Sequence, residues 1–237
     1  MIQQRVVVLT GAGISAESGI RTFRDNDGLW ENFHIEDVAT PQAWAADPTL
    51  VWTFYQGRRR QLNEVEPNPA HKALAELQQG VDSFLLITQN VDDLHERGGS
   101  NDVLHMHGEL RTLRCEVSGR SEERMDADDL TDEFASCTCC SEPQRMRPDI
   151  VWFGEMPMGM QTIYQAVEAC EVFIVIGSSG HVYPAADLVN IANDVGARTV
   201  LVNAEAPANA HAFDEMHLGK AGELLPSLVS EWLAAED

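Results

Sequence analysis

The chain has 237 residues, of which 44% are apolar, and this length accommodates roughly one or two domains with a substantial buried core. Sixteen Lys and Arg against 38 Asp and Glu give a formal net charge of −22, which opposes binding to nucleic acid or to anionic lipid. The sequence begins without a charged leader and a long apolar stretch, and its apolar runs are shorter than the roughly 20 residues of a membrane helix. We therefore expect a cytoplasmic protein with reduced thiols and with no nucleic-acid or membrane partner.

Short runs of branched apolar residues predict four buried parallel strands, at residues 6–9, 84–88, 172–176 and 199–202. Helical patterns lie between them, the clearest at residues 68–80, where Asn68 suits the N-cap and Pro69 the first helical position. A second helix is predicted at residues 184–195. Strands that alternate with helices indicate an α/β fold with a doubly wound, Rossmann-like parallel sheet.

The stretch from residue 111 to 149 interrupts this alternation. Seven carboxylates lie between Glu122 and Glu133 among few apolar residues, so no hydrophobic core is expected from this composition. A module without a core needs another source of stability, such as a bound metal. We predict a small zinc-binding domain at residues 111–149, inserted into a Rossmann-like domain of residues 1–110 and 150–237. A further helical insertion is predicted near residues 33–66.

Clustered cysteines supply the ligands for that metal. Cys115, Cys137 and Cys140 are the expected ligands, and the last two have the C-x-x-C spacing of a zinc knuckle. The residue three positions after Cys115 is Ser118, so a second C-x-x-C pair is missing and either Cys139 or Cys140 completes the shell. Four cysteines without a nearby histidine favour a structural zinc over a catalytic one.

A glycine-rich turn follows the first predicted strand. Residues 11–16 read GAGISA, a G-x-G-x-x-A form of the turn in which backbone amides at a helix N-terminus approach a pyrophosphate. The motif alone is weak evidence, because the acidic ribose ligand that usually follows about 20 residues later is not obvious. Residues 17–32 are too polar for a plain crossover helix, which indicates a loop that closes over a ligand.

Polar residues also follow the other three predicted strands, at 89–92, 177–180 and 203–205. The carboxyl ends of parallel strands form the ligand-binding edge of an open α/β sheet, so these segments are expected to converge. An equally good local interpretation is that Asn90 caps the next helix and Asp92 lies in its first turn.

Two histidines stand two positions apart, at His105 and His107. We expect their side chains to point to opposite faces, so they are not expected to bind one metal, and only one of them should face a site. His107 precedes Gly108, which permits close approach of a ligand, and a neutral imidazole is a capable general base.

Five motifs together resemble the sirtuins, a family of NAD-dependent protein-lysine deacylases: GAGISAESGIRTFR, TQNVDDLHERGG, HMHGEL, RPDIVWFGE and IGSSGHVYP. The resemblance spans almost the whole chain, and the incomplete first cysteine pair is similar to that of bacterial CobB-type sirtuins. It implies a Rossmann domain that binds NAD as co-substrate, a small domain with one structural Zn²⁺, and an acyl-lysine peptide held between the two.

The resemblance also implies residue roles. His107 is the expected catalytic base, with Asn90 and Asp92 in the nicotinamide ribose pocket, and the products are nicotinamide, 2′-O-acyl-ADP-ribose and free lysine. The NAD-binding residues implied by the family are Gly11, Ala12, Gly13, Ser15, Ala16, Glu17, Ser18, Gly19, Phe23, Arg24, Trp30, Gln89, Asn90, Val91, Asp92, Gly177, Ser178, Ser179, Asn203, Ala204, Glu205 and Ala221.

The substrate peptide is expected to bind as an added strand, recognised mainly through its main chain. The residues that the family places beside it are Val151, Phe153, Gly154 and Val182. Two other functions stay open: transfer of ADP-ribose to a protein nucleophile, and non-catalytic sensing of NAD.

Tyr55 and Arg58 are three positions apart and share a helical face. A Tyr-x-x-Arg motif at this place resembles class III sirtuins, which remove acidic acyl groups, and this implies removal of succinyl, malonyl and also acetyl groups. Arg58 can form a bidentate bond to a terminal carboxylate. The alternative is plain surface exposure, which is the favoured interpretation for Arg59 and Arg60.

Overall fold

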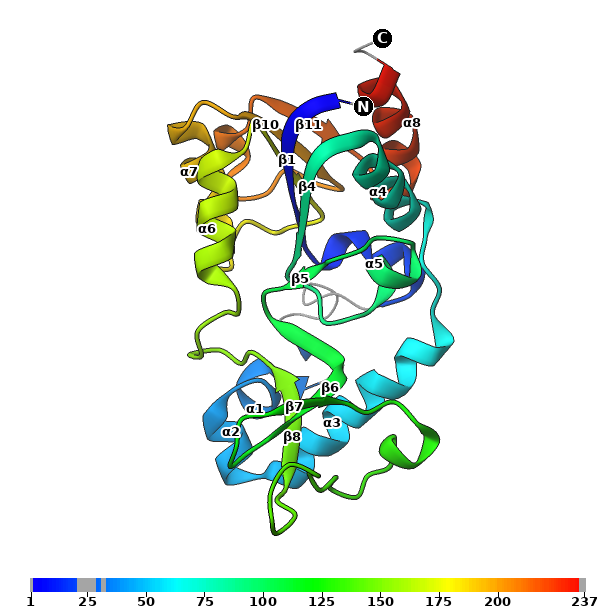
Figure 1. Cartoon of the computed structure of the whole chain (residues 1–237), viewed down its shortest axis with the longest axis vertical. Coiled ribbons are helices and arrows are strands. Elements are labelled where there is room, and N and C mark those ends of the chain that lie inside the picture. The colour runs from blue at the N-terminus through cyan, green and yellow to red at the C-terminus, as the bar shows by residue number, and fades with distance from the viewer. Residues whose placement is uncertain (1, 21–28, 31–32, 235–237) are drawn as a thin grey trace.

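The protein was analysed as a computed structural model that describes residues 2–20, 29–30 and 33–234 (Figure 1). Six parallel strands form the large sheet, in the order β11-β10-β9-β1-β4-β5. Their bounds are β1 (Ile2–Thr10), β4 (Val81–Thr88), β5 (Leu104–His105), β9 (Val172–Ile176), β10 (Arg198–Asn203) and β11 (Glu215–Leu218). The four predicted strands are confirmed, and the short edge strands β5 and β11 are additional.

Helices cover both faces of this sheet (Figure 1). On one face lie α4 (Pro69–Gly80) and α8 (Ala221–Ala234), and on the other lie α6 (Met160–Ala169) and α7 (Leu188–Asp194). Successive strand residues point to opposite faces, so Val6 and Val8 join the core under α4 and α8, whereas Val7 and Leu9 join the core under α6 and α7. The predicted doubly wound α/β fold is confirmed.

The helix predicted at residues 68–80 is α4, and its cap is as expected. The Asn68 side chain accepts a hydrogen bond from the Ala70 amide (2.9 Å), and its own amide donates to the Ile14 carbonyl (2.7 Å). The helix predicted at 184–195 is shorter, because a 3₁₀ turn, η5 (Ala185–Asp187), precedes α7. No helix in the described part of the chain is long and apolar enough to cross a membrane.

A second, antiparallel sheet has the order β7-β6-β8, formed by β6 (Gly108–Cys115), β7 (Ser121–Glu123) and β8 (Met146–Ile150). The helices α1 (Ile35–Val38), α2 (Pro41–Ala46) and α3 (Pro48–Gln61) pack with it in the half of the molecule away from the large sheet (Figure 1). The remaining elements are β2 (Leu29–Trp30), β3 (Phe33–His34), α5 (Leu94–Arg97) and the 3₁₀ turns η1 (Ala12–Ile14), η2 (Ala16–Ser18), η3 (Leu62–Glu64), η4 (Ala127–Asp129) and η6 (Ala210–Ala212).

The small sheet has an apolar core, contrary to the expectation for residues 111–149. Val51 and Trp52 of α3 are buried against Leu113 of β6 and against Met146 and Ile150 of β8. The composition of the cysteine-rich segment does not reveal this core, because most of its residues come from another part of the chain. The domain boundaries given above stay a prediction.

Arg59 corrects a second expectation, since it is buried rather than on the surface, with 1% of it exposed. Its guanidinium donates to the Leu110 carbonyl (3.0 Å), to Gln56 Oε1 (3.1 Å) and to the Asp129 carbonyl (3.1 Å). Burial lowers the pKa of Arg59 to about 10. Arg59 therefore ties α3 to the small sheet, whereas Arg60 is exposed as expected.

Candidate active site

The large sheet has its topological switch point between β1 and β9, because the chain builds β4 and β5 on one side of β1 and then returns to the other side. Open α/β sheets bind ligands in the crevice outside the carboxyl ends of such a strand pair. The turns that follow the two strands are joined by hydrogen bonds from Gly11 N to the Ile176 carbonyl and from Gly13 N to the Gly177 carbonyl, both 2.9 Å.

These glycines have a packing role that the sequence interpretation did not include. A Cβ atom on Gly13 would lie 2.7 Å from Gly177 Cα, and one on Gly11 would lie 2.8 Å from the Gly177 carbonyl oxygen. Only glycine allows the two turns to approach this closely. The approach brings the predicted NAD residues of the first and third strand ends together.

The segment after β1 differs from the predicted helix start. It forms the two 3₁₀ turns η1 and η2, and the Glu17 carboxylate accepts a hydrogen bond from Gly222 N (2.8 Å) in the first turn of α8. Glu17 is thus held against α8 beside Ala221, another of the predicted NAD-binding residues. Phe23 and Arg24 lie outside the described residues.

The candidate residues Asn90 and Asp92 are both buried beside Ser15. Asn90 Nδ2 donates to Ser15 Oγ (3.0 Å), and Asp92 Oδ1 accepts from Leu94 N (3.2 Å) at the start of α5. The capping alternative is wrong for both residues, because the N-cap of α5 is Asp93 and Asp92 precedes it. Burial raises the pKa of Asp92, although the hydrogen bonds from Leu94 and Ser15 partly oppose this effect.

The expectation that His105 and His107 point to opposite faces was wrong, because side chains two positions apart on an extended segment lie on the same side. Both rings bond consecutive carbonyls of the segment after β4, whereas Met106 between them joins the core under α6 and α7. His107 Nδ1 lies 3.1 Å from the Gln89 carbonyl oxygen, and His105 Nδ1 lies 3.1 Å from that of Asn90. A carbonyl only accepts, so His107 Nδ1 carries the proton and Nε2 presents a lone pair. Burial lowers the pKa of His107, which keeps the ring neutral at pH 7.

Gly108 was expected to let a ligand approach, and this expectation was wrong. The residue has φ 81°, and a Cβ atom there would collide with the Asp149 carbonyl oxygen of β8. The glycine permits close pairing of β6 with β8, directly after His107. Its position beside the histidine serves the packing of the small sheet.

The third and fourth strand ends are also joined. Gln89 Nε2 donates to Ser178 Oγ (3.1 Å), and Asn203 Nδ2 donates to the carbonyl oxygens of Ser178 (3.0 Å) and Glu205 (2.8 Å). Ala204 and Glu205 are exposed at the rim. The predicted convergence of polar segments at one edge of the sheet is therefore what the structure shows.

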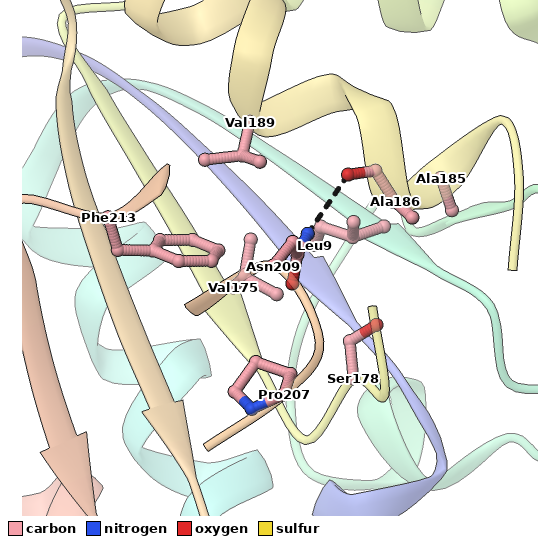
Figure 2. A pocket seen from close by; sticks show the side chains of 9 residues that line it. All are labelled: Leu9, Val175, Ser178, Ala185, Ala186, Val189, Pro207, Asn209 and Phe213. Carbon is pink, nitrogen blue, oxygen red and sulfur yellow. Dashed lines mark hydrogen bonds between the residues drawn. The ribbon is translucent and has the colours of Figure 1, made fainter. Parts of the chain in front are cut away.

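A small apolar pocket lies behind this edge, between β1, β9 and α7 (Figure 2). Its polar lining comes from Ser178 and Asn209, and the Asn209 amide already donates to the Ala186 carbonyl (3.0 Å). Ser178 is its only member among the predicted NAD residues. We interpret this pocket as a packing defect rather than as the site.

The predicted acyl-pocket residues Tyr55 and Arg58 are buried on α3, with 1% and 6% of each exposed, so the surface alternative is wrong for both. Tyr55 Oη accepts a hydrogen bond from Trp152 Nε1 (3.0 Å). The charge of Arg58 lowers the pKa of Tyr55 against the larger effect of burial, and it also lowers that of Asp92. Arg58 thus acts electrostatically on residues of both the predicted acyl pocket and the predicted ribose pocket.

The predicted peptide-binding residues 151–154 begin beside His107. Val151 N donates to the His107 carbonyl and Phe153 N donates to the Ala39 carbonyl, both at 2.9 Å. Phe153 is 49% exposed, and Gly154 is exposed as well. Val182, in the segment after β9, is half-buried.

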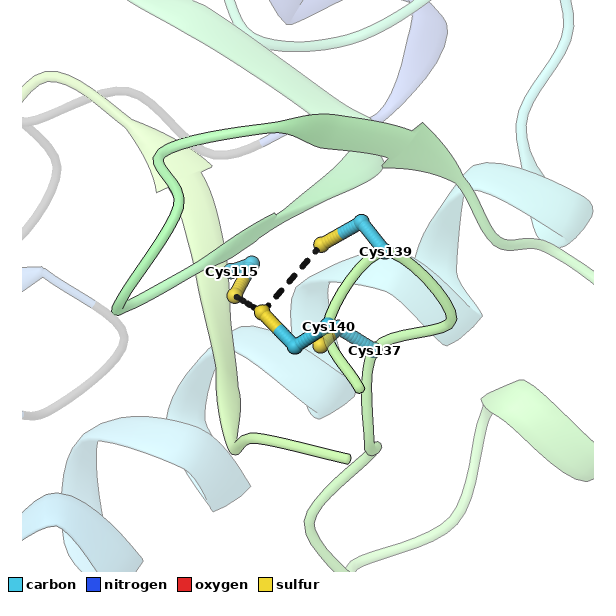
Figure 3. Close-up of side chains that lie close together, drawn as sticks. All are labelled: Cys115, Cys137, Cys139 and Cys140. Atoms are coloured by element: carbon cyan, nitrogen blue, oxygen red, sulfur yellow. Dashed lines mark hydrogen bonds between the residues drawn. The ribbon is translucent and has the colours of Figure 1, made fainter. Parts of the chain in front are cut away.

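All four clustered cysteines face one another (Figure 3), and their Sγ atoms lie within 4.8 Å. The Cys115 to Cys140 and Cys139 to Cys140 sulfur distances are both 3.8 Å. Tetrahedral zinc with Zn–S bonds of about 2.3 Å requires sulfurs about 3.8 Å apart, so this donor set fits the ion. Cys139, which the sequence left open, joins Cys115, Cys137 and Cys140.

Ser118 occupies the position of the missing second cysteine and contacts two of the four thiols. Its amide donates to Cys115 Sγ (3.4 Å), and its Oγ lies 3.0 Å from Cys139 Sγ. The Gln144 amide donates to Cys137 Sγ (3.4 Å). The hydrogen bonds from Ser118 lower the pKa of Cys115 to about 6. Outer hydrogen bonds of this kind orient metal ligands.

A sheet-edge site with a neutral histidine, a buried Asn–Asp segment and a separate four-cysteine cluster defines an α/β enzyme with a structural metal site. Residues 11–184 match the model of the Sir2 family, and the chain belongs to this family. The predicted resemblance to the sirtuins is confirmed.

Relatives and solved structures agree with this assignment. An NAD-dependent protein deacylase of Shewanella oneidensis (strain MR-1) is 54% identical over 238 residues, which cover 98% of this chain and 95% of that protein. A crystal structure of a Sir2 homologue with NAD superposes with a TM-score of 0.87 at 41% identity, over 97% of this chain and 90% of that one. A mutant Sir2 homologue with 2′-O-acetyl ADP ribose gives a TM-score of 0.88 at 41% identity, over 98% and 94%.

Proposed function

We propose that the protein is an NAD-dependent protein-lysine deacylase that removes succinyl and malonyl groups and also acetyl groups. The products are nicotinamide, 2′-O-acyl-ADP-ribose and the free lysine side chain, and the macromolecular partners are acylated proteins. The observation that carries the proposal is His107, whose Nε2 is an acceptor at the carboxyl edge of the sheet, beside Asn90 and Asp92.

NAD supplies the ribose that receives the acyl group when it is bound. The protein's own contribution at that ribose is a base, because His107 Nε2 can take a hydroxyl proton while Nδ1 stays bonded to the Gln89 carbonyl. The Gln89 carbonyl then stabilises the imidazolium that forms. Asn90 Nδ2 is fixed by Ser15, so the amide is oriented before a substrate arrives.

The preference for acidic acyl groups rests on Arg58. An acyl chain that ends in a carboxylate would enter a pocket whose buried cation is close enough to Asp92 to lower the pKa of that carboxyl. A bidentate bond from a desolvated guanidinium gives about 2 to 4 kcal/mol of preference, or roughly 30- to 1,000-fold. The neutral acetyl group gains nothing from it.

Arg58→Met tests this preference with acetyl-, succinyl- and malonyl-lysine peptides and NAD. We expect kcat/KM for the two acidic acyl groups to fall by about 30-fold or more, and kcat/KM for acetyl to change by less than about threefold. Arg60→Met is the matched control, because Arg60 lies two positions on in the same helix and is exposed. Tyr55→Phe is a poorer test, since it also removes the acceptor of Trp152 Nε1.

Equal losses on all three peptides would contradict the role of Arg58. Mass spectrometry of the same reactions separates the alternatives: ADP-ribose attached to the peptide would indicate a transferase, and no release of nicotinamide would indicate an NAD sensor. The presence of O-acyl-ADP-ribose and free lysine is the expected result.

A further inference from the structure

His105 lies in an environment unlike that of His107. It is buried, with 8% exposed, and its Nδ1 is 3.1 Å from the Asn90 carbonyl oxygen while its Nε2 is 2.8 Å from Glu96 Oε1. A carbonyl and a carboxylate both accept hydrogen bonds and donate none. A neutral imidazole has one N–H group, so only the protonated ring donates to both partners.

The charged groups around His105 favour this state. Glu96 of α5 raises the pKa of His105 by its hydrogen bond and its charge, Glu109 of β6 raises it by charge, and together they outweigh burial. A cation at His105 also stabilises the ionised form of Asp92, because the charge of His105 lowers the pKa of that carboxyl. His95 is the opposing neighbour, but burial lowers its pKa well below the usual value, so it stays neutral.

The bond from His105 ends on a segment that carries the candidate chemistry. The Asn90 backbone amide donates to Thr88 Oγ1 (3.0 Å), its side chain donates to Ser15 Oγ (3.0 Å), and its carbonyl accepts a hydrogen bond from His105 Nδ1. Three contacts from three directions fix Asn90. Of these three hydrogen bonds, only the one from His105 comes from a group that titrates.

We propose that the buried His105 and the partly exposed Glu96 form an ion pair that positions Asn90 and Asp92, so that use of NAD requires a protonated His105. His105 is a positioning residue, because it acts through the Asn90 carbonyl. The inference rests on the proposed function, which places Asn90 and Asp92 at the ribose. Above the pKa of His105 the ring loses a donor, one of its two bonds breaks, and kcat/KM for NAD declines.

The protonation state can be measured without any reaction. In the full chain labelled with ¹⁵N-histidine, we expect the NMR spectrum at pH 7 to show protons on both nitrogens of His105 and on Nδ1 alone of His107. Glu96→Gln keeps an acceptor for Nε2 but removes its charge, so the midpoint of the His105 titration should fall by about one pH unit, a tenfold loss of proton affinity. Glu76→Gln, at an exposed position of α4, is the control and should leave the midpoint unchanged.

The alkaline limb of kcat/KM for NAD should move by the same amount in Glu96→Gln. His105→Gln, which keeps a donor for the Asn90 carbonyl but has no titrating ring, should lose about tenfold in kcat/KM for NAD and lack that limb. A neutral His105 at pH 7, or a midpoint that Glu96→Gln does not move, would overturn the inference. If the wild-type protein released no nicotinamide, the proposed function would be wrong. The NMR measurement would still test the protonation state of His105, because it needs no reaction.

Discussion

Two histidines separated by one residue are held in opposite protonation states by their hydrogen bonds. His107 has one acceptor partner and stays neutral, while His105 has two and is protonated. The family resemblance selected His107 as the base, but the predicted opposite orientation of the two rings was wrong, because side chains two positions apart on a strand share a face. The sequence did not reveal Glu96 as the partner of His105, since that contact depends on how α5 packs.

His107→Tyr is a direct test at this scale. The substitution removes the lone pair of Nε2 and should reduce deacylation by more than about 1,000-fold, because a positioned base contributes about 10² to 10⁴. Binding of NAD, measured by calorimetry, should change by less than about tenfold. Turnover that survives the substitution would exclude His107 as the base.

Helix α3 shows how one element serves two purposes. Its residues Tyr55 and Arg58 form the proposed acyl pocket, and Arg59 bonds the carbonyls of Leu110 and Asp129. Three consecutive arginines gave no sequence signal for which side chains are buried, because helical spacing identifies a shared face but not what covers it. The strand β11 and the helix α8 were also missed. The strand is short and partly exposed, so it has no run of buried apolar residues, and Pro226 interrupts the helical pattern of α8.

Arg59→Met tests the structural role of this helix. It leaves the acceptors of Leu110, Gln56 and Asp129 without their buried donor, so the free energy of unfolding should fall by about 2 to 4 kcal/mol. Urea unfolding of the purified protein measures this loss. The exposed Arg60→Met should change stability by less than about 0.5 kcal/mol, and similar effects of the two variants would contradict the assignment.

At the scale of the whole molecule, the free energy of unfolding depends on pH through buried neutral histidines. Burial lowers the pKa of His71 to about 4 and that of His95 well below 6.5. Below pH 6.5 the unfolded chain binds protons that the folded protein does not, so stability falls as the pH falls. His105 has a raised pKa and contributes in the opposite direction, but its stabilisation is complete below pH 6.5.

Between pH 6.5 and 5 we therefore expect the free energy of unfolding to drop by about 1.4 kcal/mol per pH unit for each of the two histidines. Few carboxylates titrate in this interval. Urea unfolding at several pH values gives the slope, to which His107 with its lowered pKa also contributes, and His71→Gln should make the slope smaller. A flat profile in the wild-type protein would show that both rings are protonated in the folded state.

The convergence of four strand ends was predictable because parallel strands present the same edge. The close contact of Gly13 with Gly177, the use of Gly108 in the small sheet and the shared core of the cysteine-rich segment were not, because each joins residues distant in sequence. The predicted cytoplasmic location and the domain limits stay predictions.

The core shared by α3 and the small sheet has a consequence for synthesis on the ribosome. Trp52 of α3 leaves the ribosome before its partners Leu113 and Met146 have been made. Its apolar surface therefore lacks a native partner during that interval, and exposed apolar surface of this kind invites aggregation or chaperone binding. The metal ligands Cys137, Cys139 and Cys140 emerge after Leu113 and shortly before Met146, so zinc is expected to secure this half of the molecule only once most of it has been made.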